Sequence, residues 1–118
     1  IETHLQNGNV LNMPYADGFF DSVLLISILE HLRPDEQLPA FHEIRRVLKP
    51  GGQVVYGAPV ERPFMAFVFR LLGYDIRKHH FSTEQDIAQA AQQLLKPVRI
   101  VPMVSLFGAI YQVGHFEK

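Results

Sequence analysis

One stretch, residues 20–59, constrains the fold more than any other part of the chain. It begins with an apolar run at residues 23–28 and ends with a second apolar run at residues 53–58. Apolar runs without alternation are typical of parallel strands. Between them, apolar residues recur every three or four positions from 35 to 48, which predicts a helix with one buried face. The stretch therefore predicts two parallel strands joined by a helix.

The residues in and after the predicted helix set conditions on where it begins and ends. Pro39 can be accommodated only in the first turn, because a proline further inside lacks the N–H that the helix requires. Gly51 and Gly52 follow the last apolar position, and we expect glycine there to supply the positive φ that ends a helix. The charged residues between the apolar positions should face solvent. They include Glu43, Arg45 and Arg46.

The carboxyl ends of the two strands are the places to search for a functional site. Ligands of parallel sheets bind in the crevice beyond those ends. In this chain the relevant residues are those just after Ile26 and just after Tyr56. Ser27 and His31 are polar residues that follow the first strand.

Several motifs in this region occur in the order and spacing of a known family. They are FD at residues 20–21, EHL at 30–32, EIRRVLKPGG at 43–52 and, upstream, GNVLNMPYAD at 8–17. Together they resemble the core of the class I S-adenosylmethionine-dependent methyltransferases, in particular the small-molecule branch of the ubiquinone and menaquinone methyltransferases. The upstream motif is similar to that family's loop after its third strand, commonly GDAxxLPF. The similarity is close over residues 8–59 and loose elsewhere.

The resemblance implies an α/β fold that is incomplete. Family members begin with a strand that carries a glycine-rich turn, followed by a strand ending in an acidic residue that binds the cofactor ribose. Neither has a counterpart in this sequence. We therefore expect residues 1–118 to form a single incomplete methyltransferase domain. Its partial Rossmann-like sheet would lack the first two strands and end with an antiparallel strand pair.

The resemblance also implies S-adenosylmethionine as the cofactor. Asn9 and Val10 match the family positions whose side chain and backbone amide bind adenine. Ile26 and Ser27 match the strand end that flanks the methionine part of the cofactor. Asparagine retains a carbonyl acceptor but lacks the negative charge of aspartate. Considered without the family, Asn9 is a typical turn residue and Ser27 an ordinary strand-end hydroxyl.

His31 is the candidate catalytic residue. The family often has histidine at this position, near the meeting point of substrate and cofactor, and histidine can accept or orient a proton at neutral pH. The alternative is a structural histidine that only makes hydrogen bonds. Methyl transfer can depend largely on positioning, so the lack of an obvious base does not argue against this chemistry.

A second, strongly apolar helix is predicted at residues 61–73, begun by Pro63 and ended by Gly73. Because its side chains are apolar on nearly all sides, it is a core helix, the lining of an apolar pocket, or a contact with a partner or a bilayer. The family places substrate-covering elements here. We therefore expect Phe64 and Phe67 to contact a small, apolar acceptor.

The following loop carries His79 and His80, which contact the substrate or simply lie in solvent. Adjacent histidines lack the spacing of a helical zinc site, and the sequence has no cysteine, so we expect no metal. Further on, Ser82 and Thr83 are N-cap candidates for another helix.

Two more strands are predicted at residues 98–104 and 109–116. The connection between them is short, which requires antiparallel pairing. Pro102 fits an outer strand.

Composition narrows the class of protein. With 118 residues, 47% hydrophobic and 19% charged, the chain has the makeup of an ordinary folded domain. A net charge of -1 with dispersed basic residues does not favour nucleic acid. No apolar run reaches the roughly 18 residues of a membrane span, and there is no secretory signal. We expect a cytoplasmic location.

Two functions from different classes follow from these observations. The first is an enzyme that transfers a methyl group to a small acceptor, as part of a larger domain. The second is a non-catalytic, methyltransferase-like interaction module. A dinucleotide-binding fragment is a weaker alternative, because nothing resembles a glycine-rich phosphate loop.

The expected gap in the sheet has two consequences. The strand at residues 23–28 would expose a flat apolar edge, so we expect self-association or strand exchange through that edge. The missing cofactor contacts are worth about 1.5 to 3 kcal/mol each. We therefore expect the isolated chain to be inactive.

Overall fold

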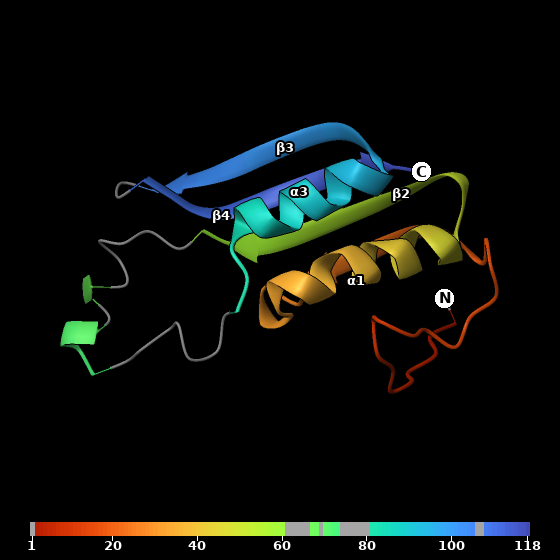
Figure 1. Ribbon diagram of the computed structural model, residues 1–118, viewed down its shortest axis with the longest axis horizontal. Coiled ribbons are helices and arrows are strands. Elements are labelled where there is room, and N and C mark those ends of the chain that lie inside the picture. Colours follow the sequence, from red (N-terminus) through yellow and green to blue (C-terminus); the bar gives the residue numbers. More distant parts are fainter. Residues whose placement is uncertain (1, 61–66, 69, 74–80, 106–107) are drawn as a thin grey trace.

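The computed structural model describes residues 2–60, 67–68, 70–73, 81–105 and 108–118. Figure 1 shows helices packed against a twisted sheet. The elements are β1 (Phe20–Ile26), the short 3-10 helix η1 (Leu29–His31), α1 (Pro34–Val47), β2 (Leu48–Pro59), α3 (Glu84–Leu94), β3 (Lys96–Ser105) and β4 (Gly108–Glu117).

The sheet has the topology that the sequence predicts. Its strand order is β1-β2-β4-β3. The pairing of β1 with β2 is parallel, and β4 pairs antiparallel with both β2 and β3. The predicted parallel pair and the antiparallel C-terminal pair are both confirmed. Pro102 lies in the outer strand β3, as its missing N–H requires.

The core lies between the helices and one face of the sheet. Val54, Tyr56 and Phe116 face α1 and α3 and are 0% exposed, as are Phe41 and Ile44 of α1. On the opposite face the sheet is open in the described part of the chain. The predicted cover of β1 on both faces is therefore wrong for this structure, since Leu24 is 66% exposed and Ile26 56% exposed.

Helix α1 begins and continues for identifiable reasons. Pro34 is its first residue, where a missing N–H costs nothing, and the Arg33 amide donates to Glu36 Oε1 at 3.0 Å. The prediction that Pro39 lies in the first turn is wrong, because it lies inside the helix in the second turn. Burial of Phe41 and Ile44 beyond the proline stabilises the helix through it.

The two chain reversals around the parallel pair differ in detail from the prediction. β1 ends at Ile26 instead of Ile28, because Ser27 adopts a left-handed backbone with φ 51°. Gly51 has φ 77°, as expected, but it lies within β2, after α1 has already ended at Val47. Gly52 is not among the residues with positive φ.

The C-terminal helix has a complete capping box. Thr83 Oγ1 accepts from the Asp86 amide at 3.3 Å, and Asp86 Oδ2 accepts from the Thr83 amide at 2.9 Å. Thr83, one of the two predicted candidates, is therefore the N-cap of α3. Most of the helix predicted at residues 61–73 lies outside the described residues. Within the described ranges, no helix has both the length and the apolarity that crossing a bilayer requires.

Candidate functional site

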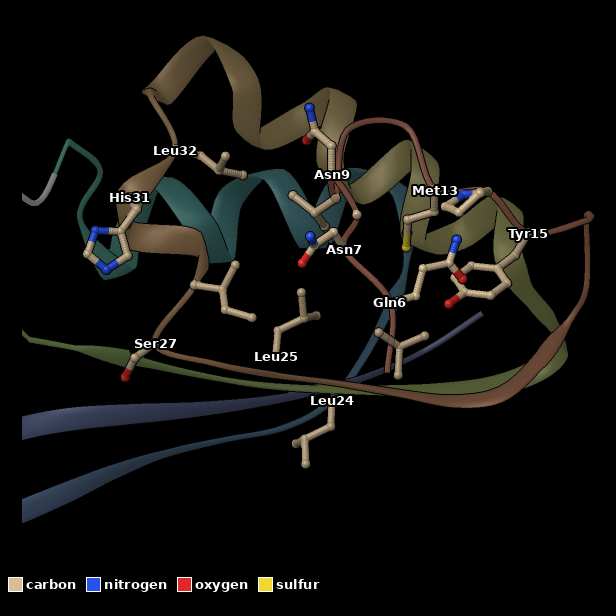
Figure 2. Close-up of a pocket in the computed structure, with 15 residues that line it drawn as sticks. Gln6, Asn7, Asn9, Met13, Tyr15, Leu24, Leu25, Ser27, His31 and Leu32 are labelled. Carbon is tan, nitrogen blue, oxygen red and sulfur yellow. The ribbon is translucent and has the colours of Figure 1, made fainter. Parts of the chain in front are cut away.

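A hollow of about 790 Å³ lies along the free edge of β1. We call it the β1 hollow. Figure 2 shows Ser27 and His31 at one end, Met13 and Tyr15 at the other, and Leu25 between them. Residues 6–10 and 13–15 of the N-terminal segment form part of its lining. Its lining residues are Gln6, Asn7, Gly8, Asn9, Val10, Met13, Pro14, Tyr15, Val23, Leu24, Leu25, Ser27, Ile28, His31 and Leu32.

The chemistry of this lining is apolar with neutral polar groups. Apart from His31, which can gain a charge, no described residue of the lining is ionised at neutral pH. Its polar side chains are the amides of Gln6, Asn7 and Asn9 and the hydroxyls of Tyr15 and Ser27. Pockets of roughly 300–1,000 Å³ with apolar walls and a few polar groups are typical of small-molecule sites. The β1 hollow suits a flat, mostly neutral ligand that offers hydrogen-bond donors and acceptors.

The end of β1 beside the hollow has a strained backbone and is hydrogen-bonded to β2 and β4. Ser27 is the one described non-glycine residue with positive φ, and strained backbone of this kind clusters at functional sites. Its amide donates to the Gly57 carbonyl at 2.9 Å, and its Oγ lies 2.9 Å from Tyr111 Oη. A Cβ on Gly57 would lie 2.6 Å from the Tyr111 ring, so only glycine lets the ring lie this close. Sequence reasoning missed Tyr111, because no local motif pairs it with Ser27.

His31 lies at the mouth of the hollow beside a buried carboxylate. The His31 side chain is 51% exposed and that of Glu30 is 3% exposed, and Nε2 lies 3.7 Å from Glu30 Oε1. The other carboxylate oxygen, Glu30 Oε2, is buried and has no hydrogen-bond partner within the described residues. At 3.7 Å the two side chains are neighbours but are too far apart for a hydrogen bond.

Four of the predicted site residues come together here. Asn9, Val10, Ser27 and His31 all line the β1 hollow. Ile26 does not line it.

Of the four predicted acceptor contacts, Phe67 lies within the described residues, and it does not line the β1 hollow. Phe67 is 59% exposed and lines a separate, smaller hollow of about 300 Å³ with Arg70 and Leu71. The remaining predicted contacts, Phe64, His79 and His80, lie outside the described residues.

Asn9 makes a local turn as well as lining the hollow. Its Oδ1 accepts from the Leu11 amide at 3.0 Å, and its carbonyl accepts from the Asn12 amide at 3.0 Å. The turn interpretation of Asn9 therefore describes part of what this residue does. In Figure 2 the Asn7 side chain points toward Leu25, and the Asn9 side chain points away from β1. Asn7 is thus a second amide available to a ligand, which the sequence did not single out.

The far wall of the hollow is attached to α1 by an ion pair. Arg46 donates to the carbonyls of Met13 and Tyr15, and to the carboxylates of Asp17 and Glu43. The hydrogen bond from Arg46 lowers the pKa of Glu43, and the hydrogen bond to Glu43 raises the pKa of Arg46 well above its ordinary value. The prediction that both face solvent is wrong, since the side chains of Glu43 and Arg46 are only 15% and 32% exposed. Among the described residues, no group of three or more acidic or histidine side chains could bind a metal ion.

Comparison with known sequences identifies the first half of the chain. Residues 2–56 match the family described as a methyltransferase domain. The demethylmenaquinone methyltransferase of Bacillus velezensis is 44% identical over 54 residues, which are 46% of this chain and 22% of that protein. The matches cover between 16% and 22% of the length of this and two other curated relatives. The methyltransferase resemblance read from residues 8–59 is therefore confirmed.

Comparison with solved structures identifies the fold of the whole chain. The N-methyltransferase NodS from Bradyrhizobium japonicum, solved with S-adenosyl-L-homocysteine, matches with a TM-score of 0.68 and 18% identity, over 94% of this chain and 52% of that one. The cyclase SpnF matches with a TM-score of 0.74 and 16% identity, over 96% of this chain and 54% of that one. At such identities the likeness establishes the fold, a partial Rossmann-like α/β sheet, and leaves the reaction to the site.

Proposed function

We propose that this chain, which carries part of a methyltransferase domain in residues 2–56, serves S-adenosylmethionine-dependent methyl transfer to a small, apolar acceptor as part of a larger domain. The observation that carries the proposal is the convergence of Asn9, Val10, Ser27 and His31 on the β1 hollow. Those positions are where the family resemblance assigns the cofactor and the reacting groups.

The lining fits an adenosyl ligand in size and chemistry. Leu25 and Val10 provide apolar surface for a flat purine ring, and the Asn7 amide, which points toward Leu25 in Figure 2, provides donors and an acceptor for its edge. Ser27 lies beside the hollow just after the carboxyl end of β1, and its hydroxyl pairs with Tyr111. When bound, S-adenosylmethionine supplies an electrophilic methyl group on a sulfonium. Binding of the same cofactor's product by the structural neighbour NodS supports this assignment.

His31 is the residue we propose to receive a proton when the acceptor loses one. His31 lines the hollow, its side chain is 51% exposed, and its Nε2 lies 3.7 Å from Glu30 Oε1. An imidazole can act as a general base at neutral pH. Where the acceptor atom carries no proton to lose, the same ring contributes only to positioning the acceptor.

A small, apolar acceptor is supported by the relatives' names and by the chain's own apolar surface. One sequence relative is a demethylmenaquinone methyltransferase. We propose that Phe64, Phe67, His79 and His80 contact the acceptor. The exposed Phe67 provides apolar area outside the β1 hollow, on the segment that the resemblance assigns to the acceptor.

The isolated chain should bind the cofactor weakly. Its matches span about half to two thirds of the neighbouring structures, and β1 is an edge strand in the described sheet. Two absent charge-assisted contacts, at about 1.5 to 3 kcal/mol each, correspond to roughly a hundredfold to ten-thousandfold in affinity. We therefore propose that residues 1–118 form a single incomplete domain that is inactive alone. We also propose that it works in the cytoplasm.

The open edge of β1 favours a second candidate function, a non-catalytic module that associates through this strand. Leu24 and Ile26 on β1 are more than half exposed, and unpaired strand edges are templates for pairing. The likeness to SpnF, which is described as a cyclase, is a reminder that this fold serves more than one reaction. Light scattering after size exclusion tests self-association. Leu24→Lys should shift dimer to monomer, and Gln92→Lys, which adds the same charge on α3, should not. A concentration-independent monomer for the unmodified chain contradicts the module.

Titration with S-adenosylhomocysteine, followed by backbone amide chemical shifts, tests the cofactor proposal. We expect shifts confined to the β1 hollow, with a dissociation constant of sub-millimolar or weaker. Ser27→Ala should weaken binding severalfold. Ser22→Ala, an exposed serine of the same strand that does not line the hollow, should leave it unchanged. No shifts at millimolar ligand would overturn the proposed function, and submicromolar binding would overturn the expected inactivity of the isolated chain.

A further inference from the structure

The wall of the β1 hollow opposite its Ser27 end is built from a loop at residues 13–18, which we call the wall loop. Met13, Pro14 and Tyr15 of this loop line the hollow. We infer that Arg46, which lies outside the hollow on α1, is the positioning residue that sets the shape of this wall and thereby the affinity for an adenosyl ligand. The inference rests on the function proposed above.

The guanidinium of Arg46 uses all of its hydrogen-bond donors. Nε donates to Glu43 Oε1 at 2.9 Å, and one Nη donates to the Tyr15 carbonyl and to Asp17 Oδ1, both at 2.8 Å. The other Nη donates to the Met13 carbonyl at 3.0 Å and to Glu43 Oε1. An arginine side chain has five N–H groups in a planar fork. All five are satisfied, so the planar guanidinium fixes the positions of the two wall-loop carbonyls relative to each other.

The wall loop also donates back to the same two residues. The Met13 amide donates to Glu43 Oε1 at 3.3 Å, and the Gly18 amide donates to the Arg46 carbonyl at 2.9 Å. Both ends of the loop are therefore attached to one turn of α1. In the sequence, Glu43 and Arg46 were expected only to face solvent, whereas in the structure both bind the wall loop.

Lysine cannot replace arginine in this arrangement. An ammonium group has three donors that radiate from one atom, and it cannot reach two carbonyls and two carboxylates in one plane. The loop has a second, independent attachment, since the Tyr15 ring packs against Phe19 at 5.4 Å and against Phe20 at 4.8 Å. Loss of the Arg46 side chain should therefore loosen the wall without unfolding the chain.

The expected effect on binding follows from the population of the closed wall. When only a fraction of the protein has the conformation that binds a ligand, the affinity is reduced by that fraction. A wall that is formed one tenth of the time therefore lowers the affinity about tenfold. Arg46 is not itself among the residues that line the hollow. Its effect on affinity would pass entirely through Met13, Pro14 and Tyr15.

The test uses Arg46→Gln, Arg46→Lys and the matched control Arg45→Gln in the whole chain. Arg45 is exposed and adjacent, so its substitution removes the same charge from the same helix. Amide exchange at Met13, Tyr15 and Gly18 reports the wall loop directly. Chemical-shift titration with S-adenosylhomocysteine, at a temperature where every variant is fully folded, reports the ligand.

We expect Arg46→Gln to speed exchange in the wall loop and weaken S-adenosylhomocysteine about tenfold, with Arg46→Lys recovering only part of either effect. Arg45→Gln should behave like the unmodified chain. Unchanged affinity in Arg46→Gln, or an equal loss in Arg45→Gln, overturns the positioning role. If Arg46 only stabilises the fold, Arg46→Gln should lower the unfolding midpoint without changing the affinity for S-adenosylhomocysteine. If the unmodified chain does not bind while Arg46→Gln still speeds loop exchange, the proposed function fails and the loop attachment stands without a ligand to position.

Discussion

On the face of the sheet covered by α1 and α3, Tyr56 and Phe116 are completely buried, whereas on the opposite face Leu24 leaves 66% of its surface exposed. Both faces are made of the same strands and are similarly apolar in sequence. The covered face contains a continuous cluster that reaches from Leu25 on β1 to Phe116 on β4. The open face has no such cluster in the described part of the chain.

This difference separates stability from function. Burial of apolar area is the dominant favourable term in folding, so the covered face supplies most of the stability. The strained Ser27 and the β1 hollow lie at the edge of the sheet, where packing is looser. Binding sites need surface that is still accessible after folding. We therefore expect substitutions on the covered face to change stability, and substitutions at the edge to change binding.

Truncation of neighbouring leucines on β1 gives the largest expected contrast. Leu25→Ala removes a side chain that is 5% exposed and should cost about 2 to 5 kcal/mol of unfolding free energy, because it leaves a cavity. Leu24→Ala, one residue away on the open face, should stay within about 0.5 kcal/mol. Urea unfolding measures both. Equal losses would mean that the open face is covered in solution.

The buried phenol of Tyr56 gives the covered face a dependence on alkaline pH. Burial raises the pKa of Tyr56 from 10.0 to about 12, so the folded state keeps its proton longer than the unfolded state does. The stability contribution is complete below pH 10 and is lost as the pH rises toward 12, by about 3 kcal/mol in total.

Tyr56→Phe provides the control for this titration. The difference in unfolding free energy between the two chains should fall across that pH range and be flat below it. Near neutral pH the variant should be at least as stable, because Tyr56 Oη is buried with no hydrogen-bond partner in the described residues. A pH-independent difference would show that the hydroxyl is solvated in the folded state.

Alanine substitutions at two glycines, each lying against a tyrosine ring, test how rigidly the two faces of the sheet are packed. A Cβ at Gly114 would overlap the buried Tyr56 ring, and a Cβ at Gly57 would lie 2.6 Å from the half-buried Tyr111 ring. Tyr56 cannot move away, so Gly114→Ala should cost about 1 to 3 kcal/mol. Tyr111 can turn toward solvent, so Gly57→Ala should lose only the hydrogen bond between Tyr111 and Ser27, which is worth about 0.5 to 1.5 kcal/mol. The reverse order, measured by urea unfolding, would contradict the assignment of the packed face.

The sequence predicted the covered face well, because its signals are local. Unbroken apolar runs predicted the parallel strands, the three-to-four spacing predicted α1, and Thr83 with Asp86 predicted the start of α3. Pro39 was placed wrongly because burial of Phe41 and Ile44 outweighs a missing helical hydrogen bond. Local pattern is sufficient where one energetic term dominates.

The sequence predicted the site only in part, because its contacts join distant residues. The family motif led to Asn9, Ser27 and His31, which do meet at one hollow. Nothing in the pattern around Tyr111 indicates that its hydroxyl reaches Ser27, which is 84 residues away. Likewise, the periodicity of α1 assigned Arg46 to solvent, since a helical wheel cannot show a loop that returns to cover it.

The smallest expected effect concerns the strained edge, and a double-mutant cycle is required to detect it. Ser27→Gly relieves a left-handed conformation that costs an L-residue about 1 to 2 kcal/mol. It also adds chain entropy to the unfolded state, about 0.5 to 1 kcal/mol, and removes the hydrogen bond to Tyr111, about 0.5 to 1.5 kcal/mol. These terms nearly cancel, so the single variant should be close to neutral. In a Tyr111→Phe background the hydrogen bond is already absent, and the same substitution should stabilise the chain by up to about 1 kcal/mol. Identical effects of Ser27→Gly in both backgrounds, measured by urea unfolding, would mean that the two hydroxyls are not coupled and that the strain at Ser27 is maintained by the parallel strand pair alone.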